Sequence, residues 1–217
     1  PKKYFNNLLK WFDDIDADCI GGVWNTDVLN KTVKSSAIKK VLTNKFGVGN
    51  GLFRIGITKP TLVDTVPFGC YKKEIFNKIG LMNEDLIRNQ DIEFNKRLIQ
   101  NGGKVFLVPN VSCTYYARET YLPIALNNFK NGYWNPLTIY FTKNFSSLSA
   151  RHFIPLLFVL SIIIPTILSI IYFKFIYFAL LSFLSHLLLL SFLSFKLNDS
   201  STTCLSIFKA FYTLHLS

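Results

Sequence analysis

Two uncharged runs of 21 residues each constrain the fold of this 217-residue chain more than any other feature. They cover residues 153–173 and 175–195, and only Lys174 separates them. A helix of 21 residues is roughly 32 Å long, which matches a hydrocarbon core of about 30 Å. A pair of buried helices in a soluble protein is the alternative, but uninterrupted apolar runs of this length are typical of membrane spans. The sequence therefore predicts a transmembrane helical hairpin.

Charged residues gather in the part of the chain that precedes these runs. Residues 1–152 contain 21 of the 24 Lys and Arg residues and 12 of the 13 Asp and Glu residues, so their net charge is +9. Residues 153–217 contain almost no charge. This asymmetry predicts a basic, water-facing domain over 1–152 and a membrane region over 153–217.

The basic residues that flank the two runs predict the orientation of the hairpin. Lys143 and Arg151 precede the first run, and Lys196 and Lys209 follow the second. Because positive residues favour the cytoplasmic side, we expect both ends of the hairpin in the cytoplasm. Residues 204–217 are expected to form either an interfacial amphipathic helix or the start of a third span that is cut off at the end of the chain.

The excess of positive charge does not indicate a nucleic-acid partner. The Lys residues are scattered and form no stripe interleaved with aromatic residues, as a nucleic-acid interface would require. Such a charge suits a domain held near anionic lipids, and it attracts anionic substrates such as sugar nucleotides. The cysteines are too far apart for a zinc or redox motif and fit a reduced cytosol. They are Cys19, Cys70, Cys113 and Cys204.

Helical and extended patterns alternate along the water-facing part, which predicts an α/β class. A glycine-rich loop at 46–51 lacks the residues of a phosphate loop or a dinucleotide fingerprint and is expected to be a flexible loop beside a substrate. Helices are expected over 4–12, 26–42, 72–79 and 91–101, and strands over 63–71, 104–108 and 111–117.

An acidic cluster at residues 13–18 contains two overlapping Asp-x-Asp patterns. Such a pattern can hold a divalent metal against a diphosphate. A metal motif of this kind normally ends a buried strand, whereas these residues follow an amphipathic helix. We therefore expect a solvated turn between a helix and a strand, and no metal site in this chain.

The segment 88–98 gives the sharpest candidate for chemistry. On a helix, Asp91 shares a face with Phe94 and Leu98. A carboxylate in this place is either an acid that the helix dipole favours or a general base that points into a cleft, and spacing alone leaves both open. Glu93 and Arg97 are expected to form a surface pair.

Several motifs together resemble family 2 glycosyltransferases, in particular the succinoglycan-type enzymes of bacterial exopolysaccharide synthesis. The motifs lie at 63–76, 80–82, 88–91 and 102–104, and the stretch from Asp64 to Gly103 is the specific part of the likeness. The likeness continues in shorter motifs and covers nearly the whole chain. These lie at 19–22, 46–50, 132–134 and 213–217.

The resemblance implies a GT-A (Rossmann-like) fold and inverting transfer of a sugar from a nucleotide donor. Gln90-Asp91 matches a Glu-Asp pair of the family, which implies that Asp91 is the catalytic general base for the acceptor hydroxyl. The resemblance implies substrate-binding roles for Gln90, Asp64, Gly69 and Trp134. The sequence Gly-Tyr-Trp that ends at Trp134 departs from the Gln-x-x-Arg-Trp of processive synthases, so processivity stays open.

The resemblance also implies that the nucleotide-binding half of the domain precedes residue 1. The expected cofactor is Mg or Mn, which the full-length enzyme would bind through an Asp-x-Asp upstream of this chain. Residues 1–152 would then be the acceptor-side part of a GT-A domain, and this fragment alone is expected to be inactive.

The sequence thus predicts a membrane-bound inverting glycosyltransferase at the bacterial inner (plasma) membrane, with its catalytic domain in the cytoplasm. Its expected partners are a nucleotide-sugar donor, a lipid-linked saccharide or polysaccharide acceptor and the membrane, with no nucleic acid. Two alternatives stay open: a polyprenyl-phosphate sugar synthase, and a non-catalytic membrane scaffold with a degenerate domain.

Overall fold

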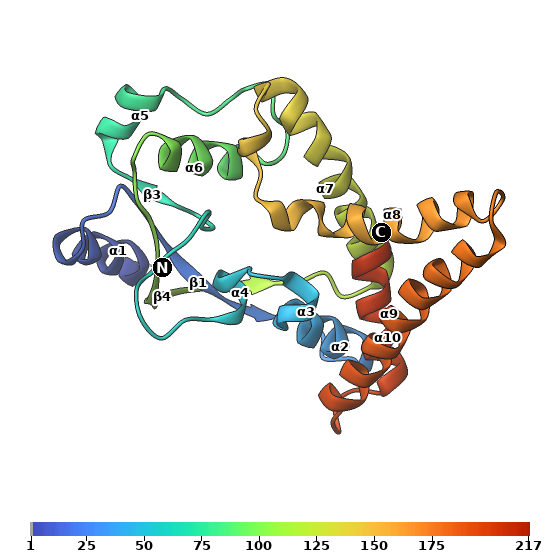
Figure 1. Cartoon of the computed structure of the whole chain (residues 1–217). Helices are drawn as coiled ribbons and strands as arrows, with labels where there is room; N and C mark the ends of the chain where they lie inside the picture. The colour runs from blue at the N-terminus through green and yellow to red at the C-terminus, as the bar shows by residue number, and fades with distance from the viewer. Residues whose placement is uncertain (1) are drawn as a thin grey trace. The chain divides into compact units, whose positions relative to one another are not determined.

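The structure is a computed structural model that describes residues 2–217 (Figure 1). The chain is mixed α/β and divides into two compact units. The division differs from the expected one at residue 152, because two segments of the water-facing part group with the apolar helices. Unit 1 contains the residues up to Asp27, Leu42–Ala117 and Phe129–Ser149, and unit 2 contains Val28–Val41, Arg118–Asn128 and Ala150–Ser217.

Unit 1 is built on a four-stranded mixed sheet with the order β2-β4-β1-β3. The two long strands β1 and β4 run parallel in its centre, and the short strands β2 and β3 pair antiparallel to them. The strands are β1 (Cys19–Asp27), β2 (Thr61–Leu62), β3 (Cys70–Tyr71) and β4 (Val105–Tyr116). The helices that lie wholly in this unit are α1 (Lys2–Asp14), α3 (Lys45–Val48), α4 (Leu52–Ile55), α5 (Lys73–Ile79), α6 (Gln90–Gln100) and the 3-10 turn η1 (Phe145–Ser147).

Helices cover both faces of this sheet, because successive side chains of a strand point to opposite sides. On one face α6 buries Phe94 and Leu98 against β1 and β4, and on the other α1 buries Leu8. The first core cluster is Cys19, Val23, Val66, Ile75, Phe94, Leu98, Val105 and Leu107; the second is Tyr4, Leu8, Ala17, Ile20, Val108 and Val111.

A bulge in β4 replaces the break that the sequence predicted. Two strands were expected to end and begin around Pro109, but β4 is continuous from Val105 to Tyr116. The pairing with β1 shifts between Gly22 and Val23, where β4 contains three additional residues. A Cβ atom at residue 22 would lie 2.2 Å from the Val111 carbonyl oxygen, so only glycine lets the bulge approach β1.

Other predicted elements have different ends in the structure. The helix expected over 26–42 is wrong at its start, because β1 continues to Asp27 and α2 (Val33–Leu42) begins only at Val33. The expected glycine-rich loop is interrupted by the short helices α3 and α4. The strand expected over 63–71 is reduced to β3 at its end, whereas the helices expected over 72–79 and 91–101 are confirmed within one residue.

Unit 2 contains two helices that are long and apolar enough to cross a membrane, Ala150–Leu168 with 19 residues and Phe173–Leu197 with 25. In their most apolar stretches, none of the residues of the first helix and 17% of those of the second are buried. Such exposure is unlike the core helices of a soluble protein, and it supports membrane association. The component elements are η2 (Ala150–Phe153), α8 (Ile154–Leu168), η3 (Phe173–Phe175) and α9 (Ile176–Leu197).

The last helix, α10 (Cys204–Leu216), packs against α9. Its described part has 13 residues and is roughly 20 Å long, and both expectations for this segment, an interfacial helix and the start of a third span, stay open. Thr203 and Ser206 form a capping box at its start, in which each side-chain hydroxyl accepts a hydrogen bond from the backbone N–H of the other residue. Ile207 and Phe211 are fully buried in this unit.

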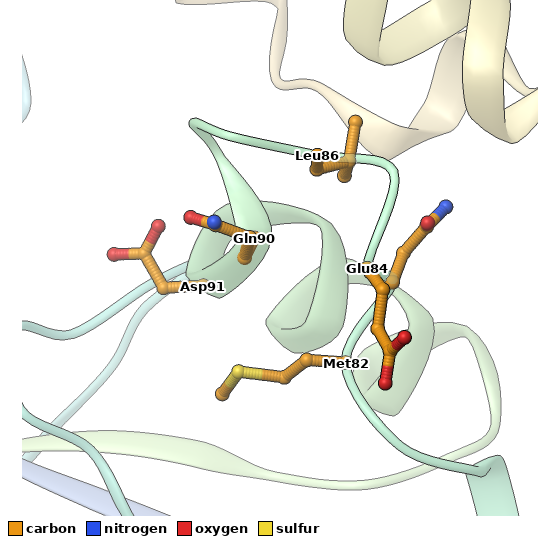
Figure 2. Close-up of a pocket in the computed structure, with 6 residues that line it drawn as sticks. Met82, Glu84, Leu86, Gln90 and Asp91 are labelled. Atoms are coloured by element: carbon orange, nitrogen blue, oxygen red, sulfur yellow. The ribbon is translucent and has the colours of Figure 1, made fainter.

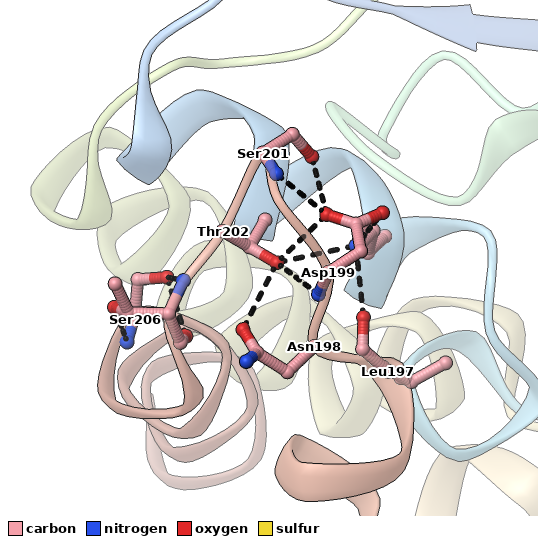
Figure 3. Close-up of polar contacts among 8 residues, drawn as sticks. Leu197, Asn198, Asp199, Ser201, Thr202 and Ser206 are labelled. Atoms are coloured by element: carbon pink, nitrogen blue, oxygen red, sulfur yellow. Dashed lines mark hydrogen bonds and ion pairs between the residues drawn. The ribbon is translucent and has the colours of Figure 1, made fainter.

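An exposed ion pair fastens α2 to the turn between α9 and α10 (Figure 3). The Lys40 ammonium lies 2.6 Å from a carboxylate oxygen of Asp199 and donates to the Leu197 carbonyl oxygen at 2.8 Å. It also donates to the Thr202 hydroxyl at 3.2 Å. The hydrogen bond from Lys40, followed by those from Ser201, holds the pKa of the Asp199 carboxyl well below its usual range. Within unit 2, the ion pair of Lys40 and Asp199 therefore joins α2 to the end of the apolar helix α9.

Candidate functional site

A pocket of about 430 Å³ opens at the start of α6, and Asp91 and Gln90 belong to its lining (Figure 2). The other lining residues come from the loop that joins α5 to α6. They are Met82, Asn83, Glu84 and Leu86. The pocket therefore combines two carboxylates and two amides with two apolar side chains, and none of its six lining residues is basic.

Asp91 is exposed, although it shares a helical face with buried residues. Phe94 and Leu98 lie in the core, but the first turn of α6 extends beyond the core, which leaves Asp91 in solvent. One of its carboxylate oxygens accepts a hydrogen bond from the Ile92 backbone at 2.9 Å. Gln90 and Asp91 project from this turn in the close-up. A carboxylate in this place can accept the proton of a hydroxyl group that enters the pocket.

A row of buried hydrogen bonds holds the segment that leads into β3 beside α6. The Tyr71 hydroxyl donates to the Asn95 side-chain oxygen at 2.9 Å, and the Asn95 amide donates to the Thr65 hydroxyl at 3.0 Å. Asn95 is fully buried, and burial raises the pKa of the Tyr71 hydroxyl far above its usual value. Because these buried polar groups bond to one another, the hydrogen bonds fix residues 65–71 against α6.

The expected pair of Glu93 and Arg97 is present, but its expected surface position is wrong, since Glu93 is buried. Only 8% of its side chain is exposed, and both carboxylate oxygens accept bonds from the Arg97 guanidinium at 2.8 and 3.0 Å. Arg97 also donates to the carbonyl oxygens of Ile79 and Leu81. The pair therefore holds the start of the pocket loop against α6, a structural role that helical spacing alone does not distinguish from a surface pair.

The three other predicted substrate-binding residues are not among those that line the pocket. The Asp64 carboxylate accepts a hydrogen bond from the Ser149 hydroxyl. The Trp134 ring stacks on Phe141 with a centroid distance of 6.3 Å. At Gly69, a Cβ atom would lie 2.9 Å from the Cys19 sulfur, so glycine is needed there for packing.

The acidic cluster at 13–18 is divided between the end of α1, which includes Asp13 and Asp14, and the predicted turn to β1 at residues 15–18. The Asp16 carboxylate pairs with the Lys104 ammonium at 2.6 Å, which lowers the pKa of Asp16, and Asp18 accepts from the Lys104 backbone at 2.8 Å. Within residues 2–217, no group of three or more His, Cys, Asp or Glu side chains is placed to hold a metal ion. The divalent cation expected for the full-length enzyme, bound upstream of this chain, stays a prediction.

Sequence reasoning missed four of the six lining residues and the anchoring of the loop that precedes α6. The signal was present in part, because residues 80–82 and 88–89 belong to the motifs that resemble the glycosyltransferases. The pattern gave no sign that Asn89, next to the helix, bonds to the long helix α7 (Tyr121–Thr142). That contact joins residues more than 40 positions apart in the sequence.

Part of the chain is similar to the dolichyl N-acetyl-α-D-glucosaminyl phosphate 3-β-D-2,3-diacetamido-2,3-dideoxy-β-D-glucuronosyltransferase of Methanococcus voltae. The two sequences are 34% identical over 58 residues. This stretch is 26% of the present chain and 18% of the relative, so the match covers less than a fifth of that protein. No family model matches the chain, and the comparison with solved structures found no match.

Proposed function

We propose that this chain is part of a membrane-bound glycosyltransferase that acts on a lipid-linked acceptor. The pocket at the start of α6 carries the proposal, because it places an exposed carboxylate beside amides and apolar side chains. Saccharides present hydroxyl groups and apolar ring faces, and such a lining suits both. The partial similarity to an enzyme named as acting on a dolichyl-linked sugar phosphate, and the two apolar helices, support the same reading.

In finer detail, we propose inverting transfer of family 2 type, on a GT-A fold, from a nucleotide-sugar donor in exopolysaccharide synthesis. Asp91 acts as the general base: it takes the proton of the acceptor hydroxyl as that oxygen attacks the anomeric carbon from the face opposite the leaving diphosphate. Gln90 would orient the acceptor beside it. A divalent cation would be held by residues outside this chain, and the catalytic domain would face the cytoplasm at the bacterial inner membrane.

The lining of the pocket favours a hydroxyl acceptor over a phosphate acceptor. Its two carboxylates, Glu84 and Asp91, would repel a phosphate, and no lining residue supplies a compensating positive charge. A polyprenyl-phosphate sugar synthase would need the opposite electrostatics. A hydroxyl nucleophile, in contrast, needs a base, and an exposed carboxylate can serve as one.

The test uses the full-length protein in detergent with labelled UDP-glucose, UDP-galactose and UDP-N-acetylglucosamine. Each donor is offered with undecaprenyl diphosphate N-acetylglucosamine or with undecaprenyl phosphate, and transfer of label to extracted lipid is measured. We expect transfer to the hydroxyl-bearing lipid and a loss of about 10³-fold in Asp91→Asn. Asp85→Asn, which changes a neighbouring acid outside the pocket lining, is the control. Transfer to undecaprenyl phosphate that survives Asp91→Asn would refute the proposal.

A further inference from the structure

The backbone at Asn89 is unusual for the residue that begins a helix. Its φ is +64° and its ψ is 14°, in the left-handed region, whereas a capping residue normally has an extended backbone. An Asn at a helix start normally caps the free backbone amides with its side chain. The Asn89 side chain makes no capping bond, although its carbonyl oxygen still accepts from Glu93 at 2.8 Å.

The Asn89 side chain bonds instead to α7. Its amide nitrogen donates to the Thr138 hydroxyl at 3.0 Å and to the Asn135 side-chain oxygen at 3.3 Å. Thr138 is fully buried, and its own proton is donated to the Trp134 carbonyl oxygen at 2.7 Å. The Thr138 oxygen is therefore oriented as an acceptor for Asn89.

The preceding residue uses the same face of α7. The Arg88 guanidinium donates to the Asn131 side-chain oxygen at 2.5 Å. Residues 131, 135 and 138 are spaced by four and three positions, so they form one stripe along the helix. This polar stripe of α7 receives both residues that directly precede Gln90 and Asp91.

We propose that Asn89 is a positioning residue for Asp91, and this rests on the proposed function. Asp91 is exposed, and its carboxylate accepts a hydrogen bond from the next backbone amide, so its direction follows the first turn of α6. The left-handed backbone at Asn89 sets where that turn begins, and the bonds to α7 hold this backbone in place. A non-glycine residue in such a conformation persists only where its surroundings fix it.

The decisive variants separate the backbone from the anchor. Asn89→Gly keeps easy access to the left-handed region but removes the bonds to α7, and Thr138→Val removes the acceptor from the other side. We expect each to lower kcat of the full-length enzyme by about 10- to 100-fold, because small misplacements of a catalytic group are costly. The KM for the transferred UDP-sugar should change by less than about twofold. The double variant should be no worse than Asn89→Gly alone, which already removes both bonds to α7.

Asn101→Gly is the matched control, since it removes a side-chain bond at the opposite end of α6, from Asn101 to the Arg97 carbonyl oxygen. It should leave kcat unchanged. Hydrogen–deuterium exchange gives a second measurement that needs no activity: the peptide covering 83–93 should exchange about tenfold faster in Asn89→Gly and in Thr138→Val, but not in Asn101→Gly.

The outcomes distinguish this inference from the proposed function. If Asp91→Asn is inactive while Asn89→Gly keeps wild-type kcat, only the positioning role is refuted. Additive losses in the double variant, or unchanged exchange at 83–93, would also refute it. If Asp91→Asn stays active, the proposed function fails, whereas faster exchange would still show that Asn89 anchors the start of α6.

Discussion

Two ion pairs, one in each unit, fasten a loop to a helix through a cation that also binds backbone carbonyl groups. In unit 1 Arg97 joins Glu93 to the carbonyl oxygens of Ile79 and Leu81, and in unit 2 Lys40 joins Asp199 to that of Leu197. They differ in exposure: 8% of the Glu93 side chain is exposed, against 53% of that of Asp199. Burial, rather than the number of hydrogen bonds, should decide how much each pair contributes to the free energy of unfolding.

The largest effect is expected when Arg97 is replaced. Arg97→Met leaves the buried Glu93 carboxylate without its cation and should lower the free energy of unfolding by about 3 kcal/mol. Thermal or urea unfolding of the protein in detergent, followed by circular dichroism, measures this. Lys96→Met, which also replaces a basic residue by methionine at the neighbouring position, should lower the free energy of unfolding by less than about 0.5 kcal/mol. Equal effects of the two substitutions would contradict the role given to the buried pair.

Two carboxylates in one turn of α6 should separate stability from activity. Glu93→Gln weakens charged bonds inside the protein and should cost about 2 kcal/mol of stability. Asp91→Asn changes an exposed group and should leave stability within about 0.5 kcal/mol of the wild type while it lowers transfer about 10³-fold. Unfolding curves and the transfer assay on the same preparations test both. A destabilised Asp91→Asn would mean that Asp91 acts mainly in the fold.

The exposed pair in unit 2 should be weaker and sensitive to salt. Lys40→Met should destabilise less than Arg97→Met, because water can replace the lost cation at Asp199. The difference from the wild type should shrink in about 0.5 M NaCl, since salt screens exposed charges. The thermal midpoint of both proteins at low and high salt gives the comparison. A salt-independent difference would indicate that Lys40 acts through packing.

The stabilisation by the ion pair of Asp199 and Lys40 should be lost only in strong acid. The pKa of Asp199 is lowered in the folded state, so its contribution is present above its ordinary pKa of 3.8 and is lost as the pH falls below that value. The stability difference between the wild type and Asp199→Asn should stay constant from about pH 7 to pH 5 and decrease only below about pH 4. A difference that already declines near pH 6 would exclude the carboxylate as its source.

The sequence was most informative where a pattern depends on local spacing. The apolar runs predicted both long helices, and the periodicity around Phe94 and Leu98 predicted α6 within one residue. The first apolar helix nevertheless ends at Leu168 rather than at residue 173, because the chain turns before Phe173.

The sequence was least informative where a role depends on contacts between distant segments. The Glu93–Arg97 pair is tied to the loop at 79–81 by bonds from Arg97 to two of its carbonyl oxygens. Asn89 is anchored by its bond to Thr138 of α7. Helical spacing describes only neighbours within one helix, so it cannot report either contact. The same limit applies to Gly69, whose need for a small residue comes from Cys19 on a neighbouring strand.

The bulge beside Gly22 determines which aromatic rings meet at the far end of the sheet. Val108 pairs with Gly22 and Ser112 with Val23, so β4 has three additional residues at the bulge. Because three is an odd number, odd-numbered residues of β4 beyond the bulge lie on the face that even-numbered residues occupy before it. With this reversal, the ring of Tyr115 stacks on that of Trp24 with a centroid distance of 4.3 Å, and the Arg54 guanidinium lies 4.5 Å from the Trp24 ring. A single-residue deletion within the bulge would exchange the two faces of the strand and dismantle this stack.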